Sequence, residues 1–388
     1  MKFIQLHLKQ VLYLLIIISA SSLLYIYKSF YIIDKSVKTT NIPLLEKTEI
    51  PFPEKSFFLS YNAVDPGLIE NISIFKSTED WKGSGFYDRK LFFEYPESLS
   101  LAGSDKNKIF VGKDIKLNLE KTTNFDLIVN LQTDPEDLET ANLIFIDEDN
   151  NRSNFILSKL RKGWEFIDIP REKFAAEEKF HWNKISQVQL EFIPRPLGRV
   201  VVNLGGLRAL AQNSLYQDWN IADRQILILD KRDNNISLLV RNVNPVSLEA
   251  TIKKITKADN FSFQLSYSPL ISAWSGVFFR GNYLNGYGYY LTVNGISGNQ
   301  WQVYKINKAG FKILKKGTIK NFQFKAGEWY YFKVEAKGDI IKSYFSTDGK
   351  EFMLLGTVTD GEYNSGGVGI AMSNGAVSLF NDFIFTQN

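Results

Sequence analysis

The sequence predicts an all-β protein: two tandem antiparallel β-sandwiches of the jelly-roll type, behind an amino-terminal transmembrane helix. Between Tyr330 and Lys337 apolar and polar residues alternate, which places one face of a strand on a core and the other in water. Four turn dipeptides separate short apolar runs near the carboxyl end: Gly338-Asp339, Asp348-Gly349, Gly366-Gly367 and Asn374-Gly375. Such residues reach positive φ at little steric cost, so they favour hairpins.

The amino-terminal segment, residues 1–33, is predicted to be a signal anchor. The stretch from Val11 to Tyr27 is uncharged, Lys2 and Lys9 precede it, and Lys28 follows it. About 20 apolar residues cross a bilayer, and the basic start favours an inside amino terminus. The alternative is a signal peptide cleaved near residues 19–21. In both cases the bulk of the chain is extracytoplasmic. If the segment is an uncleaved anchor, we also expect the chain to cross the cell membrane once and to contact the lipid bilayer.

Three further regions follow the anchor. Residues 34–56 contain Pro43, Pro51 and Pro53, which disfavour a helix and indicate an extended spacer. Residues 57–211 are expected to form the first sandwich, with strands at 109–111, 115–119, 125–131, 142–146 and 164–169. Residues 215–388 are expected to form the second, beginning with strands at 226–229, 237–240, 247–252 and 261–265.

Composition narrows the chemistry. The net charge is +4, and no basic cluster forms a recognisable nucleic-acid module, so no nucleic-acid partner is expected. The chain has no cysteine, which excludes disulfides and thiolate metal sites. Its two histidines are His7 and His181, so residues 215–388 cannot hold a Ser-His-Asp triad.

The carboxyl-terminal half resembles a known family. The carrying motifs are Trp274-Ser-Gly-Val-Phe-Phe-Arg280, Gly286-Tyr-Gly-Tyr-Tyr-Leu291, Val334-Glu-Ala-Lys-Gly-Asp339 and Tyr363-Asn-Ser-Gly-Gly-Val-Gly-Ile370. Together they are similar to the concanavalin A-like (laminin G-type) jelly roll and to the related domain of 3-keto-disaccharide hydrolases. The resemblance covers roughly residues 216–388 and implies a two-sheet jelly roll.

The preceding region carries a weaker resemblance. The run from Trp182 to Phe192, followed by Gly198 to Leu207, is similar to the closing strands of galactose-binding-like sandwiches and of several carbohydrate-binding modules. Many members have an acidic calcium ligand where this chain has Gly205-Gly206. The resemblance therefore implies the sandwich but not that metal ligand.

An aromatic and amide cluster provides the candidate ligand site. Eight aromatic residues lie between Trp274 and Trp301, with Asn282, Asn285, Asn294 and Asn299 among them. Aromatic faces pack on sugar rings, and amides bond hydroxyls. The predicted ligand-binding residues are Trp274, Arg280, Tyr287, Tyr289 and Asn294. Tyr287 and Tyr289 share strand parity, so we expect them on one face. The alternative is that the aromatics are strand-forming core residues.

The arrangement of the acidic residues does not indicate a glycoside hydrolase site. Between Leu215 and Asn388 no Glu-x-Asp-x-x-Glu run of the glucanase kind occurs, so no catalytic residue is assigned. A hydrolase would need an acid pair assembled from separate strands, for instance Glu335 with an acid from another strand. Asp360 and Asp382 are candidate ligands of a structural Ca²⁺, with turn capping as the alternative. No other cofactor is expected.

The sequence thus predicts a membrane-anchored, extracytoplasmic, non-catalytic carbohydrate-binding protein whose partner is a polysaccharide or glycan. Two alternatives remain open at this point. One is a glycoside or 3-keto-disaccharide hydrolase with a carboxylate pair. The other is a structural or protein-binding surface module.

Overall fold

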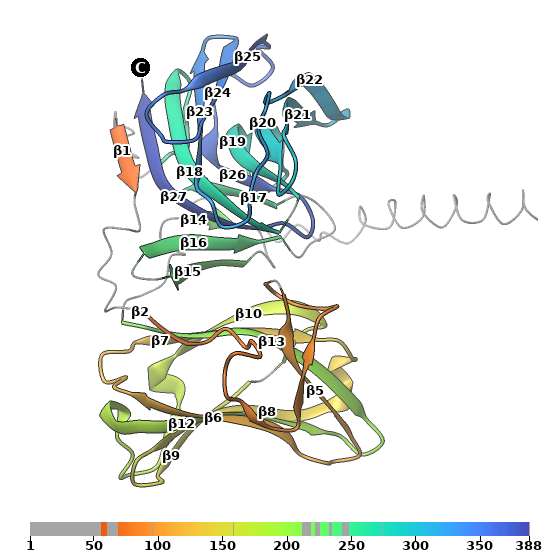
Figure 1. The fold of residues 1–388 in the computed structure, drawn as a ribbon, viewed down its shortest axis with the longest axis vertical. Coiled ribbons are helices and arrows are strands. Elements are labelled where there is room, and N and C mark those ends of the chain that lie inside the picture. Colours follow the sequence, from red (N-terminus) through yellow and green to blue (C-terminus); the bar gives the residue numbers. More distant parts are fainter. Residues whose placement is uncertain are drawn as a thin grey trace, which may run out of the picture. The chain divides into compact units, whose positions relative to one another are not determined.

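Strands form nearly all of the regular structure in the computed structural model (Figure 1). The structure describes residues 56–59, 69–94, 96–157, 159–211, 219–221, 226–232, 235–242, 248–271 and 273–387. The predicted anchor and the spacer up to residue 55 lie outside these residues. Within the described ranges, no helix combines the length and the apolar character that crossing a membrane requires. The all-β prediction is confirmed.

Residues 69–210 supply two six-stranded sheets, counted over the described residues. One runs β10 (Gly163–Pro170), β7 (Asn124–Leu131), β13 (Arg199–Leu210), β5 (Ser98–Ser104) and β4 (Gly85–Asp88), with β2 (Ile69–Ser73) also paired to β13. The other runs β11 (Ala175–Ala176), β9 (Arg152–Ile156), β8 (Leu138–Asp147), β12 (Ile185–Pro194), β6 (Ile109–Leu117) and β3 (Lys82–Gly83). Short 3₁₀ turns occur at η4 (Pro135–Asp137), η5 (Arg171–Lys173) and η6 (Trp182–Lys184). We call this unit the first sandwich.

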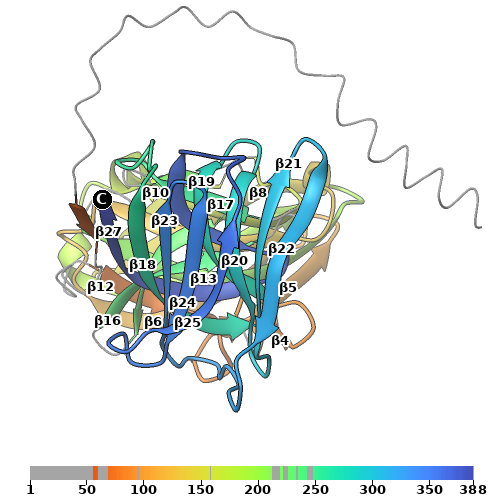
Figure 2. The same ribbon diagram turned by 90° about the horizontal axis from the view of Figure 1, so that it is seen from above.

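The second sandwich has two larger sheets. Sheet A runs β15 (Ile226–Arg232), β16 (Asn235–Arg241), β27 (Val377–Gln387), β18 (Phe261–Ile271), β23 (Tyr330–Lys337), β24 (Ile340–Ser346) and β25 (Met353–Thr359). Sheet D runs β14 (Trp219–Ile221), β17 (Leu248–Ile252), β26 (Gly367–Met372), β19 (Trp274–Asn282), β20 (Tyr287–Asn294), β21 (Gln300–Asn307) and β22 (Gly310–Thr318). Figure 2 shows β21 and β22 as a hairpin at one edge of sheet D.

The predicted alternation determines which side chains of β23 enter the core of this sandwich. On β23 the side chains of Tyr330, Phe332 and Val334 are buried, while those between them are half-buried. The buried set joins one apolar cluster contributed by both sheets. Gly338 and Gly349 take φ values of +56° and +74° in the predicted turns, because a residue without a Cβ reaches this region readily.

One predicted boundary differs from the structure. We expected residue 57 to begin the first sandwich, but β1 (Ser56–Leu59) pairs antiparallel with β27, with Phe57 opposite Phe385. The reason lies in the length of β27. Its neighbour β16 covers it only from Val377 to Phe380, so the backbone of Phe383–Thr386 is left for another strand to pair.

Buried contacts join the two sandwiches, which belong to one compact unit, Pro53–Asn388. Phe93 and Ile128 of the first sandwich share an apolar cluster with Ile226, Leu239 and other residues of the second. The Nη2 atom of Arg208 on β13 lies 2.6 Å from Oδ1 of Asp230 on β15, and both side chains are almost fully buried. We call these contacts the inter-sandwich joint.

Candidate binding cavities of the second sandwich

Strand alternation gives sheet D two different faces. Val277 and Leu291 point into the sandwich core. Phe278, Tyr290 and Tyr304 belong to a separate aromatic cluster on the opposite face of the sheet. Tyr290 and Tyr304 are stacked, with ring centroids 4.5 Å apart. The outer face of sheet D is therefore aromatic in its own right.

The larger cavity, of about 660 Å³, lies where sheet D meets its connecting loops. Its walls bring together segments that are far apart in the sequence. The amide and aromatic members of the lining are Asn220, Asn282, Asn285, Tyr283, Tyr287 and Tyr363, and its other polar members are Thr251, Thr256, Lys257, Arg280 and Ser365. No aspartate or glutamate is among the lining residues that the structure describes. Asn282 and Asn285 came from the predicted cluster, whereas Asn220 and Tyr363 were missed because no local pattern connects them to it.

The turn from β19 to β20 is fixed by its own side chains. Oδ1 of Asn282 accepts a hydrogen bond from the backbone N–H of Leu284, and Oδ1 of Asn285 accepts one from Tyr287, each at 3.0 Å. A Cβ on Gly281 would lie 2.0 Å from the ring of Phe278. That glycine is required by the close approach of the ring, so this wall of the cavity is formed before any ligand arrives.

Arg280 holds the loops around the cavity together. Its Nε donates to the carbonyl of Asp259 at 3.0 Å, and its Nη1 donates to the carbonyls of Gly338 at 2.7 Å and Tyr363 at 3.3 Å. The side chain is 1 % exposed, and burial lowers its pKa from the ordinary value. The residue has φ +46° at a bulge in β19, a strained conformation that surrounding contacts must maintain. Arg280 lines the cavity, but these bonds give it a positioning role.

Tyr289 does not share a ligand surface with Tyr287. Its ring is buried in the core, stacked on Phe279 at 5.6 Å. Its hydroxyl donates to Oδ1 of Asp360 at 2.6 Å, and burial together with that carboxylate raises the pKa of Tyr289 to about 12. Tyr287 lines the larger cavity. The expectation that the two act from one face fails because the β19 bulge and Gly288, at φ +155°, interrupt the alternation there.

The two predicted calcium ligands are engaged by other groups. Oδ2 of Asp360 lies 2.6 Å from Nζ of Lys305, which also lies 2.6 Å from Oε2 of Glu362. Burial alone would raise the pKa of Asp360, but Lys305 and the Tyr289 hydroxyl lower it below the ordinary value. Asp382 accepts a hydrogen bond from Ser266 at 3.2 Å. Across the described residues, no group of three or more acidic or histidine side chains could hold a metal ion. The calcium site stays a prediction.

Trp274 lines a different, smaller cavity of about 430 Å³ on sheet D. Its other lining residues are Gln300, Trp301, Gln302, Ile313, Lys316, Gly317 and Thr318. Asn294 lies directly opposite Trp274 in the strand register. The predicted ligand-binding residues are thus divided: Arg280 and Tyr287 at the larger cavity, Trp274 at the smaller one with Asn294 beside it, and Tyr289 in the core.

Glu335, the candidate acid of a hydrolase, has basic and phenolic neighbours. Its Oε1 lies 2.9 Å from Nζ of Lys333, and its Oε2 accepts from the Tyr344 hydroxyl at 2.7 Å. Burial would raise the pKa of Glu335, but these contacts lower it below the ordinary value. Such a carboxyl is ionised at neutral pH and is poorly suited to act as a general acid.

Comparisons with known proteins give distant similarities of fold. No family model matches the sequence, and no curated protein matches it. A carbohydrate-binding module of family 66 from Bacillus subtilis aligns at 13% identity over 44% of this chain and 96% of its own, with a TM-score of 0.36. A family 11 carbohydrate-binding module from Clostridium thermocellum aligns at 10% identity over 37% and 94%, with a TM-score of 0.28. A GH43 protein from Bacillus licheniformis aligns at 14% over 90% and 68%, with a TM-score of 0.34. Similarities this distant carry no inference about what this chain binds.

Proposed function

We propose that the chain is a carbohydrate-binding protein and that the larger cavity is its binding site. The observation that carries the proposal is the lining itself, in which three amides and three tyrosines surround a space of about 660 Å³. Small-ligand pockets commonly enclose about 300–1,000 Å³ and combine apolar walls with a few placed polar groups. Tyrosine rings offer faces for pyranose rings, and the amides offer donors and acceptors for hydroxyls.

The same lining favours binding over hydrolysis. Glycoside hydrolysis needs two carboxyl groups on opposite sides of the scissile bond, and the described lining of the larger cavity supplies no carboxyl group. Glu335 lies on β23 of sheet A, with Lys333 and Tyr344 as its neighbours. We therefore assign no catalytic role to the cavity.

We further propose that residues 1–33 hold the protein at the cell membrane with its sandwiches outside the cytoplasm. The support is the uncharged run from Val11 to Tyr27 with lysines before and after it. Protease added to intact cells should degrade the sandwiches, and alkaline extraction should leave the chain in the membrane fraction. Full protection from protease, or release by alkali, would contradict this topology.

A glycan array probed with the detergent-solubilised full chain tests the binding function. We expect at least one neutral glycan to bind, and Tyr287→Ala to weaken that binding about tenfold, since an aromatic contact contributes about 0.5–1.5 kcal/mol. The matched control is Tyr331→Ala, a half-buried tyrosine on sheet A. Absence of any glycan signal, or equal losses in the two variants, would overturn the proposal.

A further inference from the structure

Charge is distributed very unevenly along the second sandwich. From Asn260 to Gly327 the sequence contains no aspartate or glutamate, yet it contains Arg280 and seven lysines: Lys305, Lys308, Lys312, Lys315, Lys316, Lys320 and Lys325. This stretch forms β18 to β22, which includes the free edge of sheet D. Five of the seven lysines lie between Lys308 and Lys320, on or next to β22.

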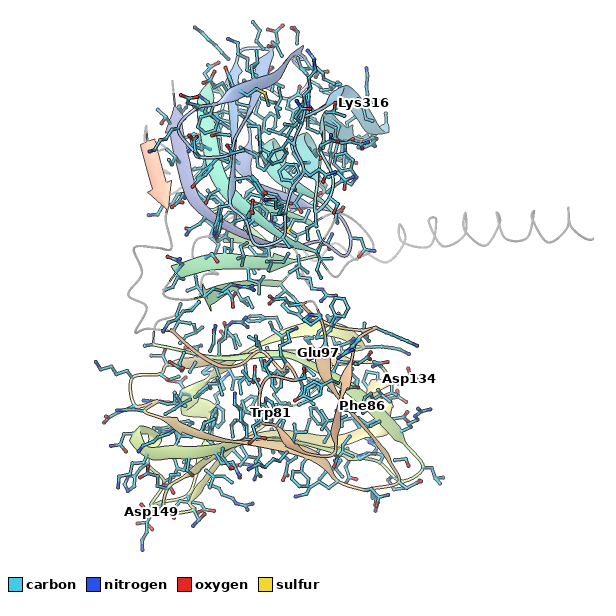
Figure 3. The ribbon with its side chains drawn as sticks, in the orientation of Figure 1. Trp81, Phe86, Glu97, Asp134, Asp149 and Lys316 are labelled. Atoms are coloured by element: carbon cyan, nitrogen blue, oxygen red, sulfur yellow. The ribbon has the colours of Figure 1, made fainter. Side chains whose placement is uncertain are left out.

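These lysines differ from Lys305 in what surrounds them. Lys305 is largely buried and lies between two carboxylates. By contrast, Lys312, Lys316 and Lys320 are exposed, and none forms an ion pair with a carboxylate of the described residues. Figure 3 shows the Lys316 side chain at the outer edge of the sandwich. The positive charge at β22 is therefore open to an external anion.

The smaller cavity joins this charge to groups suited to a sugar. Gln302 lies opposite Lys316 on one side and opposite Thr292 on the other, and directly opposed residues share a face. Gln302 donates to the Thr292 hydroxyl at 3.4 Å. Trp274 is half-buried at the cavity wall, and Trp301, at 5 % exposure, packs against Gly317. An aromatic wall, two glutamines and an unpaired ammonium group thus surround about 430 Å³.

We propose that the smaller cavity binds an acidic saccharide. The sugar ring lies against Trp274, the amides of Gln300 and Gln302 bond its hydroxyls, and Lys316 binds its anionic group. Charge-assisted hydrogen bonds to a carboxylate or sulfate are stronger than neutral ones, so the anion decides the preference. Uronic acids and sulfated sugars share this chemistry. The site is separate from the larger cavity and does not depend on the function proposed there.

The test compares charged and uncharged forms of one oligosaccharide on the full chain. The probe is hexagalacturonate, and its fully methyl-esterified form keeps the rings but loses the charges. A sulfated disaccharide series distinguishes sulfate from carboxylate. We expect hexagalacturonate to bind at least tenfold more tightly than its ester, and a rise in salt from 0.05 to 0.2 M to weaken it severalfold, because exposed charges are screened. Binding of the sulfated series alone would retain the anion site and assign sulfate as its source.

Variants assign the binding to this cavity. Lys316→Gln should weaken hexagalacturonate binding about tenfold, the loss of one charge-assisted contact, without changing the melting temperature. Lys337→Gln, which removes an exposed lysine from β23, is the matched control and should leave binding unchanged. Tyr287→Ala should leave hexagalacturonate binding intact, whereas Lys316→Gln should leave neutral-glycan binding intact. Failure of one proposal is therefore distinguishable from failure of the other.

Several results would overturn the inference. One is measurable binding of both the ester and the acid with equal affinity, and another is an equal effect of Lys316→Gln and Lys337→Gln. A third is binding of polyuridylate or phosphatidylserine vesicles as tightly as hexagalacturonate, since that would make β22 a general polyanion surface. Because Lys316 is exposed, a folding defect is not expected, and circular dichroism of each variant verifies this.

Discussion

The two sandwiches share an architecture but place their polar groups differently. In the first, the carboxylate of Glu79 accepts hydrogen bonds from the Ser73 hydroxyl at 2.5 Å and the Ile74 backbone at 2.7 Å, and it lies 2.9 Å from Nζ of Lys113. In the second, Tyr283 and Tyr287 line an open cavity. A polar group whose partners lie inside the fold stabilises it, whereas one that faces a cavity is available to a ligand.

The outer sheet faces differ in the same way. On the first sandwich, Asp126, Arg208 and Asp168 lie in one cross-strand row over β7, β13 and β10, and Arg208 continues into the inter-sandwich joint through Asp230. On the second sandwich, the smaller cavity, lined by Trp274, lies on the outer face of sheet D. Both ligand sites that we propose therefore belong to the second sandwich, although the first also has a cavity, of about 350 Å³, beside Glu70 and Lys116.

The largest expected effect comes from breaking the joint. Arg208→Met leaves Asp230 buried with one fewer cation, and removal of one partner of a buried pair costs about 3–5 kcal/mol. Burial would raise the pKa of Asp230, but Arg208 and Arg232 lower it, so the carboxylate is charged in the folded state. Urea unfolding of the full chain should show the loss. A change under about 0.5 kcal/mol in the free energy of unfolding is typical of surface substitutions. Such a small change would mean that the Arg208–Asp230 pair contributes little to the stability of the folded chain.

The next effect comes from the loops of the larger cavity. Arg280→Met removes the donors to the carbonyls of Asp259, Gly338 and Tyr363, and unsatisfied buried groups cost about 1–3 kcal/mol each. We expect a clear loss of stability together with weaker neutral-glycan binding. Arg89→Met, an exposed arginine of the first sandwich, is the control. Weaker binding with unchanged stability would instead mean that Arg280 contacts the ligand directly.

The smallest effect is a pH dependence from Asp126. Burial, and secondly the carboxylate of Asp168, raise its pKa from 3.8 to about 8, and its Oδ1 has no hydrogen-bond partner among the residues that the structure describes. The folded state therefore keeps a proton that the unfolded chain releases. The free energy of unfolding should be highest below about pH 4 and should fall as the pH rises to about 8. Asp126→Asn should remove most of this fall, because the amide does not titrate, whereas Asp149→Asn, at an exposed turn, should not. Identical pH profiles for wild type and Asp126→Asn would contradict the assignment.

Much of the fold was readable from local patterns. The alternation in residues 330–337 and the turn glycines predicted β23 and its hairpin, because side-chain direction and φ preference act over a few residues. The cluster between Trp274 and Trp301 includes Asn282, Asn285 and Tyr287, which line the larger cavity. The same cluster could not separate Tyr287 from Tyr289, since the bulge that divides them depends on the register of β19.

By itself, then, the sequence determined the strand-rich class, the turns and the acid-free basic stretch from Asn260 to Gly327, because these depend on residues close together in the chain. Tertiary structure decided the rest. Asn220 and Tyr363 line the same cavity although they are 143 positions apart in the sequence. Trp274 meets Lys316 at another cavity through three successive strand pairings, β19 with β20, β20 with β21 and β21 with β22. The physical reason is that strand pairing joins distant segments, and each pairing register decides which side chains share a face.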